Sequence, residues 1–198
     1  MSGDVQVRIC EHLRGRFPWV TRLVVLCAGA VDAPLATVRH VLDRLDLELN
    51  DSKTRIVDAR QESFNFLGFS IRVGKGLESG KSFPHVCPTP KSLAKIKDRI
   101  TQLSARKHTP IPLEAIVGSM NASLRGWSGC FHYRNSSSAQ EKVKTHAEER
   151  LRKHLMKRHK VKDRRTGLGR FPSQQLYAKY GLYKVPTKAG WKTAHALV

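Results

Sequence analysis

A run of lysine and arginine side chains in the second half of the chain could neutralise the phosphates of a nucleic acid. The members predicted to contact RNA are Lys142, Lys144, Arg152, Lys153, Lys157, Arg158, Lys160, Arg164 and Arg165. Such a run usually marks a solvated helix face. Here only Glu141, Glu148 and Glu149 compensate for the helical members, and the segment after the helix is basic as well. The pattern therefore favours phosphate contact.

Aromatic side chains alternate with cations beyond residue 160. The basic stretch 160–165 is followed by Phe171, Tyr177, Tyr180, Tyr183 and Trp191. Aromatic rings stack on unpaired bases, and neighbouring cations neutralise the phosphates. The pattern predicts a second nucleic-acid-binding surface in this segment.

Cysteine and histidine residues lack the spacing of a metal site. Cys10, Cys27, Cys87 and Cys130 form no Cys-x-x-Cys pair, and neither Cys130-x-His132 nor the histidines between 154 and 159 have zinc spacing. We therefore predict no metal site, and scattered cysteines fit a reducing cytoplasm. No stretch approaches the roughly 20 apolar residues of a membrane span, so no membrane partner is expected.

The charge of the whole chain indicates a polyanionic partner. The 198 residues carry a formal net charge of +20. From residue 91 onward there are 24 Lys and Arg against 6 Asp and Glu, a balance of +18, whereas residues 1–90 carry only +2. A nucleic acid is the first expectation; an anionic membrane surface ranks second on charge and is not among the partners we predict.

Strand-like and helix-like patterns alternate in the first half. Residues 23–27 form a continuous apolar run typical of a buried strand, and residues 54–57 predict another. Between them, a helix beginning near Pro34 would point one apolar face inward, formed by Leu35, Val38, Leu42 and Leu45.

Residues 64–73 predict a strand in which the apolar parity changes near Gly68, as at a bulge. Gly74, Gly76 and Gly80 would then form the loop of a hairpin that returns through Phe83 to Val86.

The second half predicts three amphipathic helices that pack as a small bundle. The first apolar stripe is Leu93, Ile96, Ile100 and Leu103; the second is Leu113, Ile116, Val117, Met120, Leu124 and Trp127; the third is Val143, Ala147, Leu151 and Leu155. Together with the first half, this predicts an α+β fold.

Several segments resemble the group II intron reverse transcriptases. Residues 47–57 (LELNDSKTRIV) and 64–69 (FNFLGF) resemble the last palm motifs of that family. Residues 120–127 (MNASLRGW) and 131–133 (FHY) resemble its thumb, also called the maturase or X domain. Residues 182–186 (LYKVP) resemble the end of bacterial members, so the resemblance covers roughly residues 20–198.

The resemblance implies four segments: an atypical amino-terminal segment (1–19), a truncated palm (20–90), a helical thumb or maturase domain (91–160) and a basic aromatic extension (161–198). It places Asn50, Lys53 and Thr54 near the nucleotide and primer. It makes Phe66, Leu67, Gly68 and Phe69 the primer-grip hairpin, and it puts Arg125, Gly126 and Trp127 in the thumb.

For three of these assignments, the residue types and spacing also allow a structural role. Trp127 continues an apolar stripe and fits a core position, so Arg125 is the better RNA contact. Lys53 fits a phosphate contact and a solvated turn equally well. Phe66 and Phe69 fit packed hairpin positions better than base stacking.

The sequence departs from the family where its catalytic carboxylates should lie. The family's Tyr-Ala-Asp-Asp motif would fall on Trp19, Val20, Thr21 and Arg22, which provide no carboxylate. Two-metal nucleotidyl transfer needs several oxygen ligands. We therefore expect no polymerase activity and no cofactor for the isolated chain, and Mg²⁺ only if a partner supplies the missing palm.

We interpret the chain as a maturase-like protein that assists group II intron folding and splicing by binding intron RNA, or an RNA–DNA duplex. One alternative is half of a split RNA-directed DNA polymerase; another is a decayed remnant of a reverse transcriptase. A truncated palm would leave an uncovered sheet edge beside residues 23–27, which favours a homodimer or a complementing palm fragment.

Overall fold

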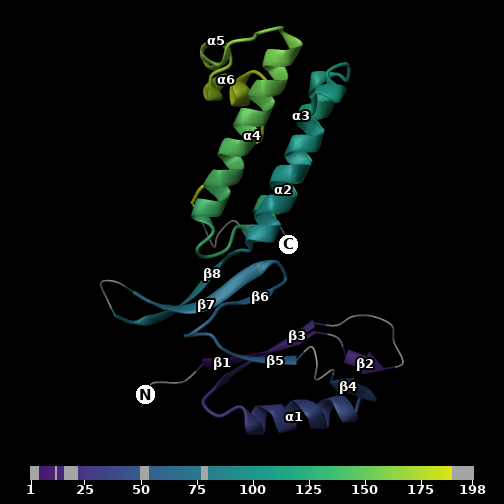
Figure 1. The fold of residues 1–198 in the computed structure, drawn as a ribbon, viewed down its shortest axis with the longest axis vertical. Helices are drawn as coiled ribbons and strands as arrows, with labels where there is room; N and C mark the ends of the chain where they lie inside the picture. Colours follow the sequence, from purple (N-terminus) through teal and green to yellow (C-terminus); the bar gives the residue numbers. More distant parts are fainter. Residues whose placement is uncertain (1–4, 12, 16–21, 50–53, 77–79, 189–198) are drawn as a thin grey trace. The chain divides into compact units, whose positions relative to one another are not determined.

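The computed structural model describes residues 5–11, 13–15, 22–49, 54–76 and 80–188. The chain divides into two compact units, with the first ending at His85 and the second beginning at Val86. Among the described residues, the first unit contains strands and one helix, whereas helices build nearly all of the second (Figure 1). The predicted α+β class is therefore confirmed.

Two small antiparallel sheets begin the first unit. Strands β1 (Val5–Glu11), β3 (Arg22–Ala28) and β5 (Thr54–Asp58) pair in the order β3-β1-β5, and β2 (Leu13–Gly15) pairs with β4 (Leu47–Leu49). The strands predicted at 23–27 and 54–57 are confirmed. One long edge of β3 is covered by β1, which lies in the segment predicted to be atypical.

Helix α1 (Asp32–Asp43) has Pro34 in its first turn, as predicted. Leu42 is buried, but Leu45 is 61% exposed and does not share the buried face. The helix ends before Leu45, and Asp46 then takes a left-handed conformation with φ 58°. The predicted apolar stripe is therefore wrong at its last position, because the helical period stops there.

Strands β6 (Phe64–Phe66) and β7 (Phe69–Lys75) form a tight hairpin. Leu67 and Gly68 are its two loop residues, with φ of 47° and 85°, which is the conformation of a type I′ turn. Phe66 pairs with Phe69 across it. The bulge predicted near Gly68 is wrong: the apolar parity changes there because the chain reverses direction.

Strand β8 (Ser82–Pro88) completes a third sheet of order β6-β7-β8, which confirms the predicted return through Phe83. Among the described residues of the first unit, Val57, Ala59 and Phe64 form a small core, against which Phe66 and Ile71 pack. This confirms that Phe66 is a packed residue rather than an exposed platform.

Three long helices form the second unit: α2 (Pro90–Leu103), α3 (Leu113–Phe131) and α4 (Ser137–Arg158). Thr89 caps α2, because its hydroxyl accepts the Ser92 N–H at 3.1 Å and Pro90 follows at the first helical position. A 3₁₀ turn (Arg106–His108) lies between α2 and α3. The three predicted stripes all contribute to one core, so the predicted bundle is confirmed.

The segment after α4 packs into the same core. It contains the short helices α5 (Arg164–Arg170) and α6 (Ser173–Ala178), which lie beside the carboxy-terminal half of α4 in Figure 1. Phe171, Leu176, Leu182 and Val185 are each at most 4% exposed. These four side chains cover a face of the bundle, so the segment after α4 is part of its core packing.

Candidate nucleic-acid interface

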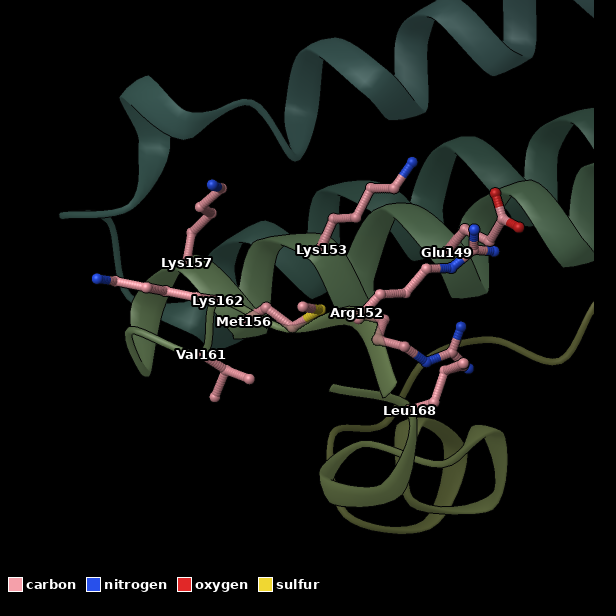
Figure 2. Close-up of a pocket in the computed structure, with 9 residues that line it drawn as sticks. Glu149, Arg152, Lys153, Met156, Lys157, Val161, Lys162 and Leu168 are labelled. Carbon is pink, nitrogen blue, oxygen red and sulfur yellow. The ribbon is translucent and has the colours of Figure 1, made fainter. Parts of the chain in front are cut away.

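A groove runs between the carboxy-terminal half of α4 and the segment that leads into α5. Its volume is about 600 Å³. Figure 2 shows Lys153, Lys157 and Lys162 reaching away from the ribbon around it. The lining residues are Glu149, Arg152, Lys153, Met156, Lys157, Val161, Lys162, Arg164 and Leu168. We call this hollow the basic groove; five of its described lining residues are cationic and one is acidic.

The same side of α4 continues into a second hollow of about 480 Å³. Lys97, Lys142 and His146 lie along it, and Glu149 lines both hollows. Because residues three and four apart share a helix face, Lys142, Glu149, Lys153 and Lys157 form one solvent-facing line. A phosphate backbone could follow this line and meet the cations Lys142, Lys153 and Lys157, with Glu149 as the one anionic member of the line.

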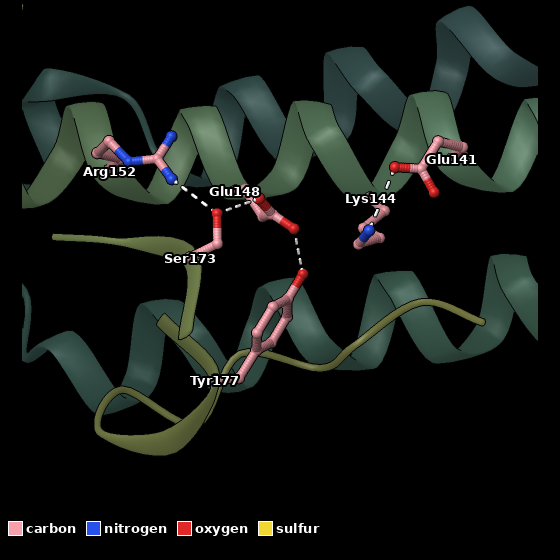
Figure 3. Close-up of polar contacts among 6 residues, drawn as sticks. All are labelled: Glu141, Lys144, Glu148, Arg152, Ser173 and Tyr177. Carbon is pink, nitrogen blue, oxygen red and sulfur yellow. Dashed lines mark hydrogen bonds and ion pairs between the residues drawn. The ribbon is translucent and has the colours of Figure 1, made fainter. Parts of the chain in front are cut away.

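Arg152 has a different role from the predicted phosphate contact. It is only 8% exposed, and its guanidinium donates to the Phe171 carbonyl at 2.9 Å and to Ser173 Oγ at 3.0 Å. Its donors are thus directed at the segment between α5 and α6 (Figure 3). Arg152 is therefore corrected to a structural residue that ties that segment to α4.

Glu148 extends the same network toward α6. Ser173 Oγ donates to Glu148 Oε2 at 2.6 Å, and the Tyr177 hydroxyl donates to Glu148 Oε1 (Figure 3). Burial raises the pKa of Tyr177, and the hydrogen bond to the Glu148 carboxylate raises it further. Glu148 was counted in the sequence as an acidic residue that partly neutralises the basic run. Its carboxylate is instead hydrogen-bonded to Ser173 and Tyr177 within the bundle.

Arg158 and Arg150 also reach neighbouring backbone. Arg158 Nη1 donates to the carbonyls of Thr109 at 2.8 Å and Ile111 at 2.6 Å. Arg150 donates to Ser104 Oγ and the Thr101 carbonyl. These partners carry no charge, so both guanidiniums still add to the positive field of α4. Arg158 is partly exposed and uses Nη1 for these bonds, so its direct contact with RNA stays a prediction.

The remaining predicted cations of this region are exposed, except Lys144. Lys142, Lys153, Lys157, Lys160, Arg164 and Arg165 are all exposed. Lys144 donates to Glu141 Oε1 at 3.2 Å and is only partly accessible. The carboxylate of Asp163 caps α5 by accepting the Thr166 N–H and hydroxyl, and these bonds hold the pKa of Asp163 below its usual value. The cap positions Arg164 and Arg165 on the first turn.

The thumb-like motif on α3 meets the carboxy-terminal segment. Asn121 Nδ2 donates to the Gly181 carbonyl at 2.8 Å, and its Oδ1 accepts the Tyr183 N–H at 2.7 Å. Arg125 is exposed, with its guanidinium 5.3 Å from the centre of the Tyr183 ring. The sequence did not single out Asn121, although it lies inside the quoted motif and the quoted LYKVP segment supplies its partner.

Trp127 and Gly126 take the positions that helical spacing gives them. Trp127 packs against the bundle core, 5.2 Å from Phe131 between ring centres, which confirms the core interpretation. Gly126 is exposed, and a side chain added there would meet open space. Of this motif, Arg125 is the residue that a nucleic acid could reach.

The described aromatic residues of the last segment pack against the bundle core, which rules out Phe171 as a base platform and leaves the three tyrosines only partly exposed. Phe171 is 2% exposed, and Tyr177, Tyr180 and Tyr183 pack against the core. Their cationic neighbours lie over the rings: Lys184 is 5.9 Å from Tyr177, and Lys179 is 5.7 Å from Tyr180. The alternation of cations and aromatics thus serves contacts within the protein. Trp191 lies outside the described residues.

The palm-like motif residues are only partly described. Asn50 and Lys53 lie outside the described residues, as do Trp19, Val20 and Thr21. Thr54 begins β5, and Phe66 to Phe69 form the type I′ hairpin described above.

The described part of the chain contains neither a metal-binding cluster nor a membrane-spanning helix. No group of three or more His, Cys, Asp or Glu residues there could hold a metal ion. No helix there is long and apolar enough to cross a membrane.

Part of the chain matches a known family. Residues 93–171 match the family model described as "Group II intron, maturase-specific domain". The matched stretch begins on α2 and ends after α5, so it contains the exposed line on α4 and all of the lining residues of the basic groove. The predicted resemblance to the carboxy-terminal part of group II intron maturases is confirmed. No curated protein matches the chain.

Proposed function

We propose that this protein, whose residues 93–171 match the group II intron maturase-specific domain, binds group II intron RNA and assists its folding and splicing. The observation that carries the proposal is the basic groove and the exposed line beside it. Lys153, Lys157 and Lys162 are exposed there, and only Glu149 opposes them among the described lining residues. An RNA–DNA duplex presents the same phosphate chemistry and is the second ligand of this surface.

The proposed mechanism is stoichiometric. The lysine and arginine side chains replace counterions along the RNA backbone, and the rigid bundle holds them at fixed spacing. In this proposal the protein supplies no catalytic group, and the splicing chemistry remains with the RNA. The replacement of the family's Tyr-Ala-Asp-Asp motif by Trp19, Val20, Thr21 and Arg22 supports a role without nucleotidyl transfer. The protein then contributes by stabilising the folded RNA.

Binding is tested with a triple variant in which Lys153, Lys157 and Lys162 become alanine. The matched control replaces Lys91, Lys95 and Lys179, which are also exposed lysines of this unit but line neither hollow. The probe is a folded group II intron RNA, titrated at several salt concentrations. The groove variant should reduce the salt slope by about 2 to 3, since each lost phosphate contact removes about 0.7–0.9.

Both variants lose the same net charge, so a groove-specific loss separates a local site from general attraction. Equal weakening by the two triple variants would contradict the proposal.

Assistance is tested by splicing at a magnesium concentration where the RNA alone splices slowly. Added protein should accelerate splicing until it equals the RNA in amount and then saturate, and the groove variant should shift the titration to higher protein. Acceleration that never saturates, or that is identical for the groove variant, would contradict a specific stoichiometric role.

A complementing palm fragment is the second candidate, favoured by the first unit. Leu26 on β3 is 67% exposed and Ile56 on β5 is 54% exposed. The register through Val7 and Arg8 of β1 places them on opposite faces of one small sheet, so each face carries an exposed apolar side chain. Exposed apolar side chains of this size favour association with another surface. Co-purification with a fragment bearing fingers and a Tyr-Ala-Asp-Asp strand, together with primer extension by the mixture, would support it. A stable monomer with no affinity for such a fragment would argue against it and against a homodimer.

A further inference from the structure

The floor of the basic groove is apolar, which a site for phosphates alone does not require. Met156 and Val161 are half-buried in it, and Leu168 is 45% exposed. Exposed apolar surface of this kind is stabilised when a ligand covers it. The four neighbouring cations Lys153, Lys157, Lys162 and Arg164 stand around this floor.

The backbone fixes the floor before any ligand arrives. The Val161 N–H donates to the Met156 carbonyl at 2.8 Å, so the chain turns tightly after α4. Asp163 caps α5 immediately afterwards, and Gly167 lets α5 approach Met156, since a β-carbon at Gly167 would lie 2.9 Å from Met156 Cγ. The groove is therefore a preformed feature of the bundle.

We infer that the basic groove takes one unpaired nucleotide of the RNA, with its base on Met156, Val161 and Leu168 and its flanking phosphates on the lysines. This inference rests on the proposed function and names the part of the RNA that the groove selects. A duplex stacks its base faces against one another and offers only phosphates and groove edges. A bulged or looped nucleotide exposes an apolar base face beside two phosphates. The apolar floor of the groove matches the base, and the cations around it match the phosphates.

Size and polarity agree with this occupant. The volume of about 600 Å³ lies within the roughly 300–1,000 Å³ typical of small-ligand sites. Glu149 adds an acceptor at the groove, and a base edge carries N–H donors that a carboxylate can accept. A phosphate would be repelled by Glu149, whereas a base edge would not.

The test uses three hairpin RNAs of the same stem. One has a single bulged 2-aminopurine nucleotide, one has an abasic nucleotide at the bulge, and one is fully paired. The wild-type protein should bind the base-containing bulge about tenfold more tightly than the abasic one, as expected for burial of a base-sized apolar surface. The 2-aminopurine emission should rise on binding, because the base leaves the stack.

Leu168→Ser removes part of the floor and leaves every cation in place. Ile111→Ser is the matched control, because Ile111 is 40% exposed in the same unit and does not line the groove. Leu168→Ser should weaken binding of the base-containing bulge roughly fivefold and leave the abasic RNA unchanged, since about 1 kcal/mol of apolar contact is lost. Ile111→Ser should change neither.

Equal affinity of the wild-type protein for the base-containing and abasic bulges would overturn the inference, independently of how any variant folds. The proposed function would survive that result if the lysine triple variant still weakened binding of all three RNAs. If the lysine variant bound as the wild type does, the proposed function itself would fail.

Discussion

Asn121 on α3 binds the backbone of Tyr183, accepting its N–H at 2.7 Å, and the same amide side chain donates to the Gly181 carbonyl at 2.8 Å. One side chain thus satisfies a donor and an acceptor of a segment 60 residues away in sequence. This pairing holds the last part of the described chain against the bundle and completes its core with Leu182 and Val185.

Asn121→Ala should loosen this segment. We expect a loss of about 1–3 kcal/mol in the free energy of unfolding, because the two backbone groups lose their partner. The rate of amide hydrogen exchange should rise more at Leu182 and its neighbours than in α2. Ser123→Ala, two residues along the same helix, should change stability by less than about 0.5 kcal/mol. An equal rise in exchange rate throughout the bundle would contradict the idea that Asn121 specifically holds this segment.

Arg152 and Lys153 are sequence neighbours with opposite expected effects. Arg152→Met should lower the free energy of unfolding by about 1.5–3 kcal/mol, because the Phe171 carbonyl loses its charged donor. Lys153→Met should leave stability within about 0.5 kcal/mol of the wild type and reduce the salt slope of RNA binding by about 1. Chemical denaturation and a salt titration of binding measure the two effects. Finding both effects in either single variant would contradict this division.

Gly167 and Met156 should be coupled. A β-carbon at Gly167 lies too close to Met156, so Gly167→Ala should destabilise the wild-type bundle even though alanine favours helix by about 1 kcal/mol over glycine. In a Met156→Ala background the obstacle is gone, and the same change should stabilise. The four proteins are compared by chemical denaturation. An effect of the same sign in both backgrounds would exclude the contact as the cause.

Two histidines of α4 that face α2 should make the free energy of unfolding depend on pH. Burial lowers the pKa of His154, which is 2% exposed with Nδ1 at 3.3 Å from the Ser104 carbonyl, and burial also lowers the pKa of His146. The unfolded chain therefore binds protons below about pH 6.5 that the folded bundle binds less readily.

The free energy of unfolding should therefore be fully retained above about pH 6.5. It should fall as the pH is lowered from about 6.5 toward the lower pKa values of the folded state. Urea denaturation between pH 8 and pH 5 measures this slope. His154→Gln should flatten it, because the proton acceptor is gone. An unchanged slope in that variant would assign the pH dependence to other groups.

The amino-acid sequence by itself determined the helices, their buried faces and the negative charge expected of the partner. The stripes on α2, α3 and α4 could be predicted because a period of three and four residues records locally which face meets the core. The excess of charge after residue 91 could be predicted because it is a property of composition. The maturase resemblance followed from residues 120–127 and its neighbours, and the family match now covers 93–171.

The tertiary structure alone decided which cations remain available and which aromatics are core. Arg152 and Lys153 are equally basic, yet one faces Phe171 and the other faces solvent, and only the docking of α5 and α6 distinguishes them. The same docking buries Phe171. The parity change at Gly68 fits a bulge or a turn until the pairing of Phe66 with Phe69 is known. In each case the deciding partner lies across a chain reversal or far along the sequence, where local patterns carry no information.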